Sequence, residues 1–151
     1  MSVLLFVPVL SAANKMAQPA IQPIIQSKVY AGYQAKLTTY GKPIQIITGA
    51  EDECNDGFFP DDYRFQSFTI RADGLIREVY LQPNNGLIFY GKKLDSNTTE
   101  ADFKNQFKGK FTQATAPHTY NATAGQDEYK SITFYFKNGK FEKYNLWMDD
   151  C

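Results

Sequence analysis

The sequence holds few of the side chains from which most catalytic and metal sites are built. It has one histidine, His118, and two cysteines, Cys54 and Cys151, among 151 residues. A Ser–His or Cys–His site needs a nucleophile beside the histidine and a third group that orients it, and no GxSxG motif occurs. A structural zinc site takes four ligands. The sequence therefore indicates no catalytic residue, no metal site and no cofactor, and it favours a protein that is not an enzyme.

An excess of charge of one sign is also lacking. The chain has 16 basic and 16 acidic residues and a formal net charge of zero, whereas proteins that bind nucleic acids or anionic membranes in general show a basic excess. The apolar run at residues 3–10 is much shorter than the roughly 20 residues that cross a bilayer. We therefore expect no nucleic-acid partner and no stable membrane insertion.

The same N-terminal run resembles the apolar part of a secretory signal peptide. Small residues follow it at positions 11–13, where a signal peptidase needs them, although no Lys or Arg precedes it. We expect residues 1–13 to be a truncated signal peptide, residues 14–22 a linker, and the protein to be exported to the periplasm or the cell exterior; the alternative is a buried strand. Export favours a disulfide between Cys54 and Cys151, the alternative being two free thiols.

Aromatic residues are abundant, with twelve Phe and ten Tyr, and they form a pattern that occurs twice. Residues 36–81 comprise a helix end, a spacer and two aromatic or apolar runs around a turn. Residues 103–147 have the same order. Gly41 corresponds to Gly109 at the helix ends, and Gly74 to Gly139 in the turns. A repeated supersecondary unit is a signal at the level of the fold.

The elements of each unit follow from local patterns. Apolar residues at every fourth position, from Ile21 to Leu37, predict a helix over residues 23–40. A capping pattern at Asn97 or Thr99 predicts a second helix that ends at Gly109. Hairpins are predicted around residues 71–74 and 137–139. The predicted strands are 44–49, 65–70, 75–81, 87–94, 111–115, 129–136 and 140–148.

These elements predict an α+β protein built from two αβββ units, residues 23–86 and 87–151. Short turns imply antiparallel pairing, and the helices would cover the sheet. The two units would lie side by side or join in one continuous curved sheet. In element order, in the glycines that end its helices and in its repeat, the chain resembles the β-lactamase inhibitory protein family. It also resembles the small outer-membrane assembly lipoproteins of the BamE/SmpA type, which carry one such unit. The resemblance implies an exported protein that grips another protein with its sheet face and loops.

One acidic segment stands out as a candidate partner site. It places six carboxylates in twelve positions, with two phenylalanines between them. Phenylalanines can anchor an interface while carboxylates steer association; the alternative is a solvated loop whose phenylalanines fold back onto the core. A calcium loop is disfavoured because Tyr63 stands where an EF-hand needs Glu. The residues selected here are Asp56, Phe58, Phe59, Asp61 and Asp62.

The matching segment of the second unit, residues 117–127, adds His118 and Tyr120 as candidate partner contacts. The leading hypothesis is a non-enzymatic exported protein-binding module. Its most concrete form is an inhibitor or immunity protein that neutralises an envelope-acting enzyme or a toxin. The alternative is a carrier of a small molecule or lipid, with a pocket between helices and sheet. Its ligand would meet an aromatic face that contains Tyr129, Tyr135, Tyr144 and Trp147, unless these residues pack in the core.

Overall fold

The computed structural model describes residues 19–124 and 127–149. Strands account for 49% of the structure and helices for 9%, and the described residues contain a single α-helix. The predicted α+β fold with helices covering the sheet is therefore wrong, because the fold is mainly β with two antiparallel sheets. The predicted signal peptide and most of the predicted linker lie outside the described residues.

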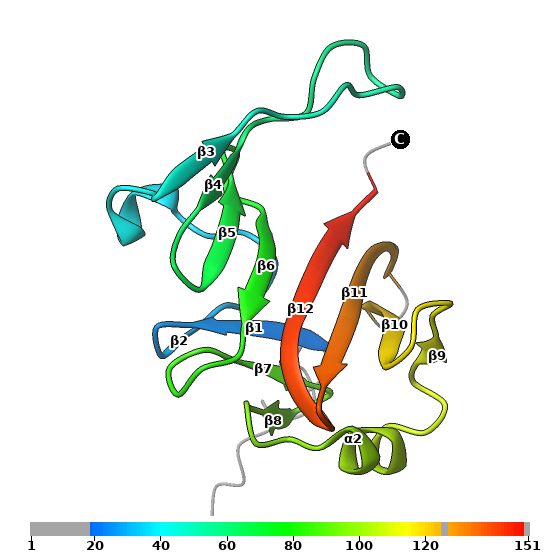
Figure 1. Ribbon diagram of the computed structural model, residues 1–151. Coiled ribbons are helices and arrows are strands. Elements are labelled where there is room, and N and C mark those ends of the chain that lie inside the picture. Colours follow the sequence, from blue (N-terminus) through cyan, green and yellow to red (C-terminus); the bar gives the residue numbers. More distant parts are fainter. Residues whose placement is uncertain (1–18, 125–126, 150–151) are drawn as a thin grey trace, which may run out of the picture.

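The larger sheet has eight strands and an approximate internal symmetry. Its spatial order is β3 (Gln45–Ile47), β4 (Asp62–Arg64), β5 (Phe68–Arg71), β6 (Ile76–Tyr80), β12 (Lys140–Met148), β11 (Asp127–Lys137), β10 (Thr119–Ala124) and β9 (Thr112–Gln113). Strands β3–β6 and β9–β12 each form an antiparallel meander (Figure 1). The two last strands pair in the middle of the sheet, where Tyr80 lies opposite Lys143 and Glu78 opposite Asn145.

The two hairpins of the sequence repeat are confirmed. Strands β5 and β6 turn at Gly74, and β11 and β12 turn at Asn138 and Gly139. Gly74 has a φ of +96°, and a Cβ at this position would lie 2.6 Å from the carbonyl oxygen of Ala35. The turn therefore requires glycine for its backbone conformation and for the close approach of the segment before β3.

The first predicted helix, over residues 23–40, is wrong. This segment forms β1 (Ile21–Ile25) and β2 (Lys28–Val29), and only η1 (Leu37–Tyr40) is helical, as one 3-10 turn. Gln26 and Ser27 make the turn with positive φ angles of 48° and 67°. Asn85 Oδ1 accepts a hydrogen bond from the Gln26 N–H at 3.0 Å. Such long-range support is invisible to a local pattern, whereas the β-branched residues of β1 suit a strand.

Strands β1 and β2 belong to a second, four-stranded sheet in the order β2-β1-β7-β8. Strands β7 (Gly86–Phe89) and β8 (Lys92–Leu94) form its other half. The predicted boundary between the two units, at 86/87, falls inside β7, and β1 pairs with β7 along its length. Residues 21–22 of the predicted linker also belong to β1. The smaller sheet thus combines segments from both predicted units.

The second predicted helix is confirmed as α2 (Glu100–Gln106). Thr99 is its N-cap, and the Thr99 hydroxyl accepts a hydrogen bond from the Asp102 N–H at 3.1 Å. The helix ends three residues before Gly109, which has a φ of +80° in the following turn. Its one buried residue is Phe103, which anchors the helix on the sheet.

The core lies between the larger sheet and a layer made of the smaller sheet and α2. Figure 1 shows β1 and β7 crossing behind β12, below the end of β6, with α2 at the lower end. The Phe103 ring lies 4.6 Å from that of Phe134, and the Phe89 ring 5.0 Å from Phe134, between centroids. Tyr144 donates a buried hydrogen bond of 2.7 Å to the Gly86 carbonyl and so ties the two sheets together. Rings therefore fill the space between α2 and the sheet.

Candidate functional site

The larger sheet has one buried and one open face, and the alternation along its strands defines them. In β12, Tyr144 and Leu146 are buried in the core, whereas Asn145 and Trp147 lie on the other face. The predicted aromatic face is therefore only partly correct. Tyr144 lies three residues before Trp147 on the same strand, so the two side chains point to opposite faces, and Tyr144 is in the core. Tyr129 and Trp147 are exposed.

The open face is hollowed where the two meanders meet. The hollow has a volume of about 620 Å³ and draws its lining from both halves of the chain. Strands β3–β6 contribute one side and β11 and β12 the other. We define the hollow by six of its lining residues, Ile47, Arg64, Arg77, Tyr80, Asn145 and Trp147. Its walls combine charged, amide and aromatic groups, which suits a polar ligand or a protein surface.

An ion pair joins β12 to β6 beside the hollow, and its acidic member, Glu78, lines the hollow. Lys143 Nζ lies 3.2 Å from Glu78 Oε2 and also lies over the rings of Tyr80 and Tyr135, at 5.4 and 4.9 Å from their centroids. Burial alone would lower the pKa of Lys143, but its hydrogen bond and attraction to Glu78 outweigh burial and raise it. Lys143 therefore stays charged, and its ion pair with Glu78 links the two meanders where β12 pairs with β6.

Asp62 lies where the two meanders diverge. Arg77 Nε is 4.0 Å from Asp62 Oδ1, and the guanidinium of Arg77 lies over the ring of Trp147. Among the described residues, Asp62 Oδ1 is buried without a hydrogen-bond partner. Burial raises the pKa of the Asp62 carboxyl, and the positive charges of Arg77 and Arg71 oppose this effect. A buried acceptor of this kind is costly unless a donor reaches it.

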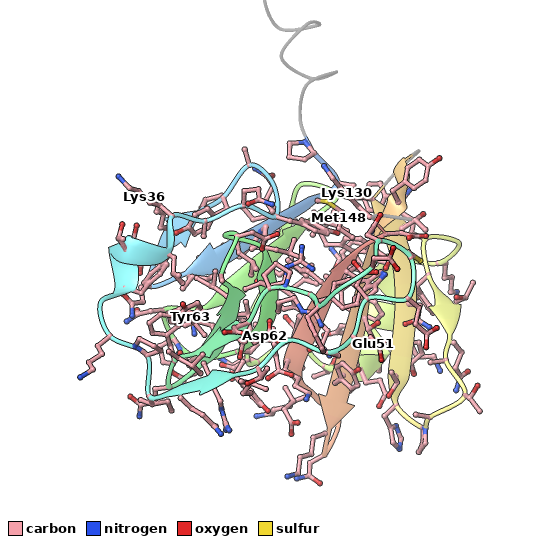
Figure 2. All side chains as sticks on the ribbon, turned by 90° about the horizontal axis from the view of Figure 1, so that it is seen from above. Lys36, Glu51, Asp62, Tyr63, Lys130 and Met148 are labelled. Carbon is pink, nitrogen blue, oxygen red and sulfur yellow. The ribbon has the colours of Figure 1, made fainter. Side chains whose placement is uncertain are left out.

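The segment between β3 and β4, residues 48–61, arches over this end of the hollow, and we call it the arm. Figure 2, viewed from above, shows it crossing from the side of Asp62 towards Met148, with Glu51 along its course. Under the arm is a second cavity of about 280 Å³, lined in part by Ile47, Phe59 and Trp147. The arm and the sheet therefore enclose a recess with Asp62 in its wall.

Specific contacts fix the base of the arm. The Asp61 carboxylate accepts a hydrogen bond of 2.9 Å from the Gly49 N–H, and the Phe59 N–H donates to the Ala50 carbonyl at 2.8 Å. The Phe59 ring meets the Trp147 ring edge-on, with 6.3 Å between centroids. A Cβ at Gly49 would lie 1.7 Å from the Phe59 carbonyl oxygen, so only glycine fits there. The two strands of the arm thus approach each other closely at the base.

The tip of the arm is also locally ordered, and it exposes its apolar residue. Asp52 Oδ1 accepts hydrogen bonds from the Cys54 and Asn55 N–H groups at 3.0 and 3.2 Å. Asp56 adopts a positive φ of 54° in the turn. Phe58 is 73% exposed. Of the two phenylalanines in the acidic segment, Phe59 packs at the base and Phe58 points to solvent.

The five candidates of the acidic segment thus take three positions. Asp56 and Phe58 lie at the tip, Phe59 and Asp61 build the base, and Asp62 faces the hollow. The arm carries five acidic residues and no Lys or Arg: Glu51, Asp52, Glu53, Asp56 and Asp61. The predicted disulfide would join this segment to Cys151, which lies outside the described residues.

His118 and Tyr120 lie elsewhere. Both contact Glu100 at the start of α2: His118 Nδ1 is 2.9 Å from one carboxylate oxygen, and the Tyr120 hydroxyl donates to the other. The Glu100 N–H bonds to the Gly139 carbonyl at the start of β12, whereas the arm contacts Trp147 near its end. Tyr120 is only 2% exposed, so it is a core residue and offers a partner no surface. His118 is exposed but far from the arm.

The sequence interpretation named Trp147 as part of an aromatic face but missed the other residues that lie in or beside the hollow near Asp62. Arg77 and Tyr80 lie on β6, and Lys143, Asn145 and Trp147 lie on β12. Strict alternation along residues 143–147 could have assigned the last three to one face. The pairing of β6 with β12, which brings the two sets together, spans more than 60 residues and has no local signature.

Within residues 19–124 and 127–149, no group of three or more His, Cys, Asp or Glu side chains is placed to hold a metal ion. In the same ranges, no helix has the length and apolar character needed to cross a bilayer. Comparison of the chain with protein-family models, with curated proteins and with solved structures found no significant match.

Proposed function

We propose that this protein binds another protein through the arm and the adjoining hollow. The observation that carries the proposal is the exposure of Phe58 at the tip of an arm whose base and tip are both held by specific contacts. An exposed phenylalanine on an ordered support can fill a partner's pocket at little cost in conformational entropy.

The charges of the arm specify the chemistry of the partner surface. Five carboxylates without a basic residue in 48–61 create a negative field around Phe58, while the chain as a whole is neutral. A partner with a basic rim around an apolar recess would complement this surface, and attraction between the two would speed encounter. The recess beside Asp62 would receive a donor group from the same partner, such as an amide, guanidinium or ammonium N–H.

The most concrete form of this function is inhibition. An acidic arm with an apolar tip suits entry into the cleft of an enzyme or toxin, so we propose an inhibitor or immunity protein that acts on an envelope enzyme or toxin. Export to the periplasm or the cell exterior is part of this proposal and is supported by the N-terminal apolar run and the two cysteines. The carrier alternative has less support, because Phe89, Phe103 and Phe134 fill the space between α2 and the sheet.

Capture followed by measurement with matched variants tests the proposal. Immobilised wild-type protein is used to capture a stoichiometric partner from the source cells, and the affinity of the purified pair is measured by calorimetry. We expect Phe58→Ala to weaken binding at least about tenfold, as for the anchor residues of other interfaces. Val29→Ala is the control, because Val29 is a half-exposed apolar residue on β2, outside the arm. This variant should bind the partner with the affinity of the wild type.

The charge contribution has a separate signature. Glu53→Gln combined with Asp56→Asn should lower the association rate and its dependence on salt, with a smaller effect on dissociation. Because both carboxylates are exposed, thermal unfolding should change little. If a captured partner binds the Phe58 variant and the charge variant as tightly and as fast as the wild type, the arm is not the binding element. Recovery of an extractable lipid or metabolite without a protein partner would support the carrier alternative instead.

A further inference from the structure

The outer strand of the first meander presents an unusual apolar surface. In the segment that leads into and forms β3, Ile44, Ile46 and Ile47 are 68%, 54% and 43% exposed. Among the strands of the described residues, β3 is the last of the larger sheet in this direction and pairs only with β4. Edge strands of soluble proteins are ordinarily protected by charges, prolines or a covering segment, because an apolar edge pairs with other strands.

The opposite edge of the same sheet shows that the fold does not demand these residues. Strand β9 is the counterpart of β3 in the second meander, and it consists of Thr112 and Gln113, both exposed. A lysine, Lys110, lies two residues before it. One edge of the sheet is therefore polar, and the other is rich in isoleucine.

The isoleucines lie on both faces of β3. Ile46 lies opposite Tyr63 of β4, a residue packed against the core, whereas Ile47 lies opposite Asp62 and lines the hollow. Paired residues of an antiparallel sheet share a face. Ile46 therefore lies on the face of the sheet that packs against the core, but beyond the segments that cover this face. Ile47 lies on the open face and extends the hollow. A strand added at this edge would bury apolar surface on both faces at once.

The charges around β3 indicate what kind of strand would fit. Residues 42–52 begin with Lys42, contain no charge from 43 to 50, and end with Glu51 and Asp52. Antiparallel pairing with an identical segment brings the basic end of each strand towards the acidic end of the other. Parallel pairing would set like charges side by side. The segment is thus complementary to an antiparallel copy of itself in both charge and apolar character.

We propose that two copies of this chain associate through their β3 strands, antiparallel and around a two-fold axis, so that the two larger sheets become one. The axis runs perpendicular to the sheet and passes beside one residue of β3, because paired residues must share a face. Both hollows then open on the same side of the dimer. This inference does not depend on the proposed function, because the pairing uses residues 42–52, whereas the proposed partner contact is centred on the exposed Phe58.

Sedimentation equilibrium of the full chain over a range of concentrations tests the association. We expect a monomer–dimer equilibrium in the wild type. Ile46→Lys should raise its dissociation constant roughly 100-fold or more, because each substitution acts twice in a two-fold interface and replaces a buried apolar side chain by a charge. Val29→Lys places the same charge at an exposed apolar position away from β3. Phe58→Ala removes the exposed ring at the arm tip. Both variants should dimerise as the wild type does.

Cysteine substitution locates the axis. Of Gln45→Cys, Ile46→Cys and Ile47→Cys, the variant nearest the axis should form a dimer linked through that residue, identified by peptide mapping. Thr112→Cys on β9 is the control and should not link. A wild type that stays monomeric at its highest soluble concentration overturns the proposal. So does a dimer that Ile46→Lys leaves intact, or one that links through β9.

Discussion

The guanidinium of Arg77 lies over the indole ring of Trp147, with its carbon 4.9 Å from the ring centroid. The two residues come from the last strands of the two meanders, beyond the point where those strands pair. Their contact therefore bridges the diverging ends of β6 and β12. The indole ring also meets Phe59, so one side chain links both meanders to the base of the arm.

Replacing Arg77 should change the fluorescence of Trp147, the only tryptophan in the sequence. Arg77→Gln removes a cation–π contact that is worth about 0.5–1 kcal/mol at a partly exposed site. We expect a shift in the tryptophan emission maximum and faster hydrogen exchange in residues 48–61. Arg64→Gln removes an arginine from the same hollow without touching the ring and should leave both unchanged. Equal spectra for the two variants would mean that Arg77 does not order the indole ring.

Asp62 should make the protein less stable as the pH rises. Burial raises its pKa above the ordinary value of 3.8, so the folded protein keeps this proton to a higher pH than the unfolded chain does. The stability that the protonated carboxyl contributes is therefore lost as the pH rises from about 3.8 through the folded pKa. Asp62→Asn should be more stable than the wild type at neutral pH and equal to it near pH 3, measured by urea unfolding.

The exposed Asp56 provides the control for that experiment. Asp56→Asn removes a solvated carboxylate from the arm, which precedes Asp62 in the chain, and Asn tolerates the positive φ of this position. We expect its stability at neutral pH to equal that of the wild type, because the Asp56 side chain is exposed. A gain at neutral pH in both variants would point to the net charge of the arm and not to burial of Asp62.

Tyr120 should stabilise the end of the molecule opposite the arm. Its hydroxyl donates to the Glu100 carboxylate, and hydrogen bonds to charged groups contribute about 1.5–3 kcal/mol. We expect Tyr120→Phe to lower the free energy of unfolding by about this amount. His118→Gln, which alters the exposed contact to the same carboxylate, should cost less than about 1 kcal/mol. Similar losses for both variants would indicate that His118 carries more of the interaction than its exposure suggests.

The hydrogen bond between Tyr120 and Glu100 also predicts a loss of stability at high pH. Burial and the hydrogen bond to Glu100 raise the pKa of Tyr120 from 10.0 to about 12. The folded state therefore holds this proton above the pH at which an unfolded tyrosine loses it. The stability that depends on it is complete below about pH 10 and is lost as the pH rises through about 12. Tyr120→Phe should show a shallower decline over this range.

The predicted disulfide between Cys54 and Cys151 can be tested by mass. The contact of Phe59 with Trp147 places the end of β12 beside the arm that carries Cys54, which supports this pairing. We expect an intact mass two hydrogens below that of the reduced chain, and a loss of about 2–5 kcal/mol on replacing both cysteines by serine. Added reductant should destabilise the wild type and leave the double variant unchanged. Equal sensitivity of the two proteins would exclude a stabilising disulfide.

Local signals were sufficient where the structure depends on neighbouring residues. The turns at Gly74 and at Asn138 and Gly139 identified both hairpins, and the Thr99 cap identified α2. They failed where distant residues decide. The turn at Gln26 is supported by Asn85, 59 positions away. A local pattern cannot show that support, so apolar residues at every fourth position wrongly predicted a helix there.

The candidate site divides in the same way. The acidic segment was predicted as a loop with partner-binding potential, but composition could not say that Phe58 is exposed while Phe59 packs on Trp147. Nor could it say that adjacent Asp61 and Asp62 have different roles, one at the base of the arm and one facing the hollow. The packing of Phe59 on Trp147 and the hollow beside Asp62 depend on the pairing of β6 with β12, which a pattern within either unit cannot contain.

That central pairing also has a consequence for how the chain is made. Strand β12 ends at Met148 and supplies half of the middle of the larger sheet, so a ribosome must synthesise the chain as far as residue 148 before the two meanders can join. Until then, the inner edge of β6 lacks its neighbour. Contacts between residues more than 60 positions apart form slowly. We therefore expect the nascent chain to depend on chaperones, and the hollow to form in the last step of folding.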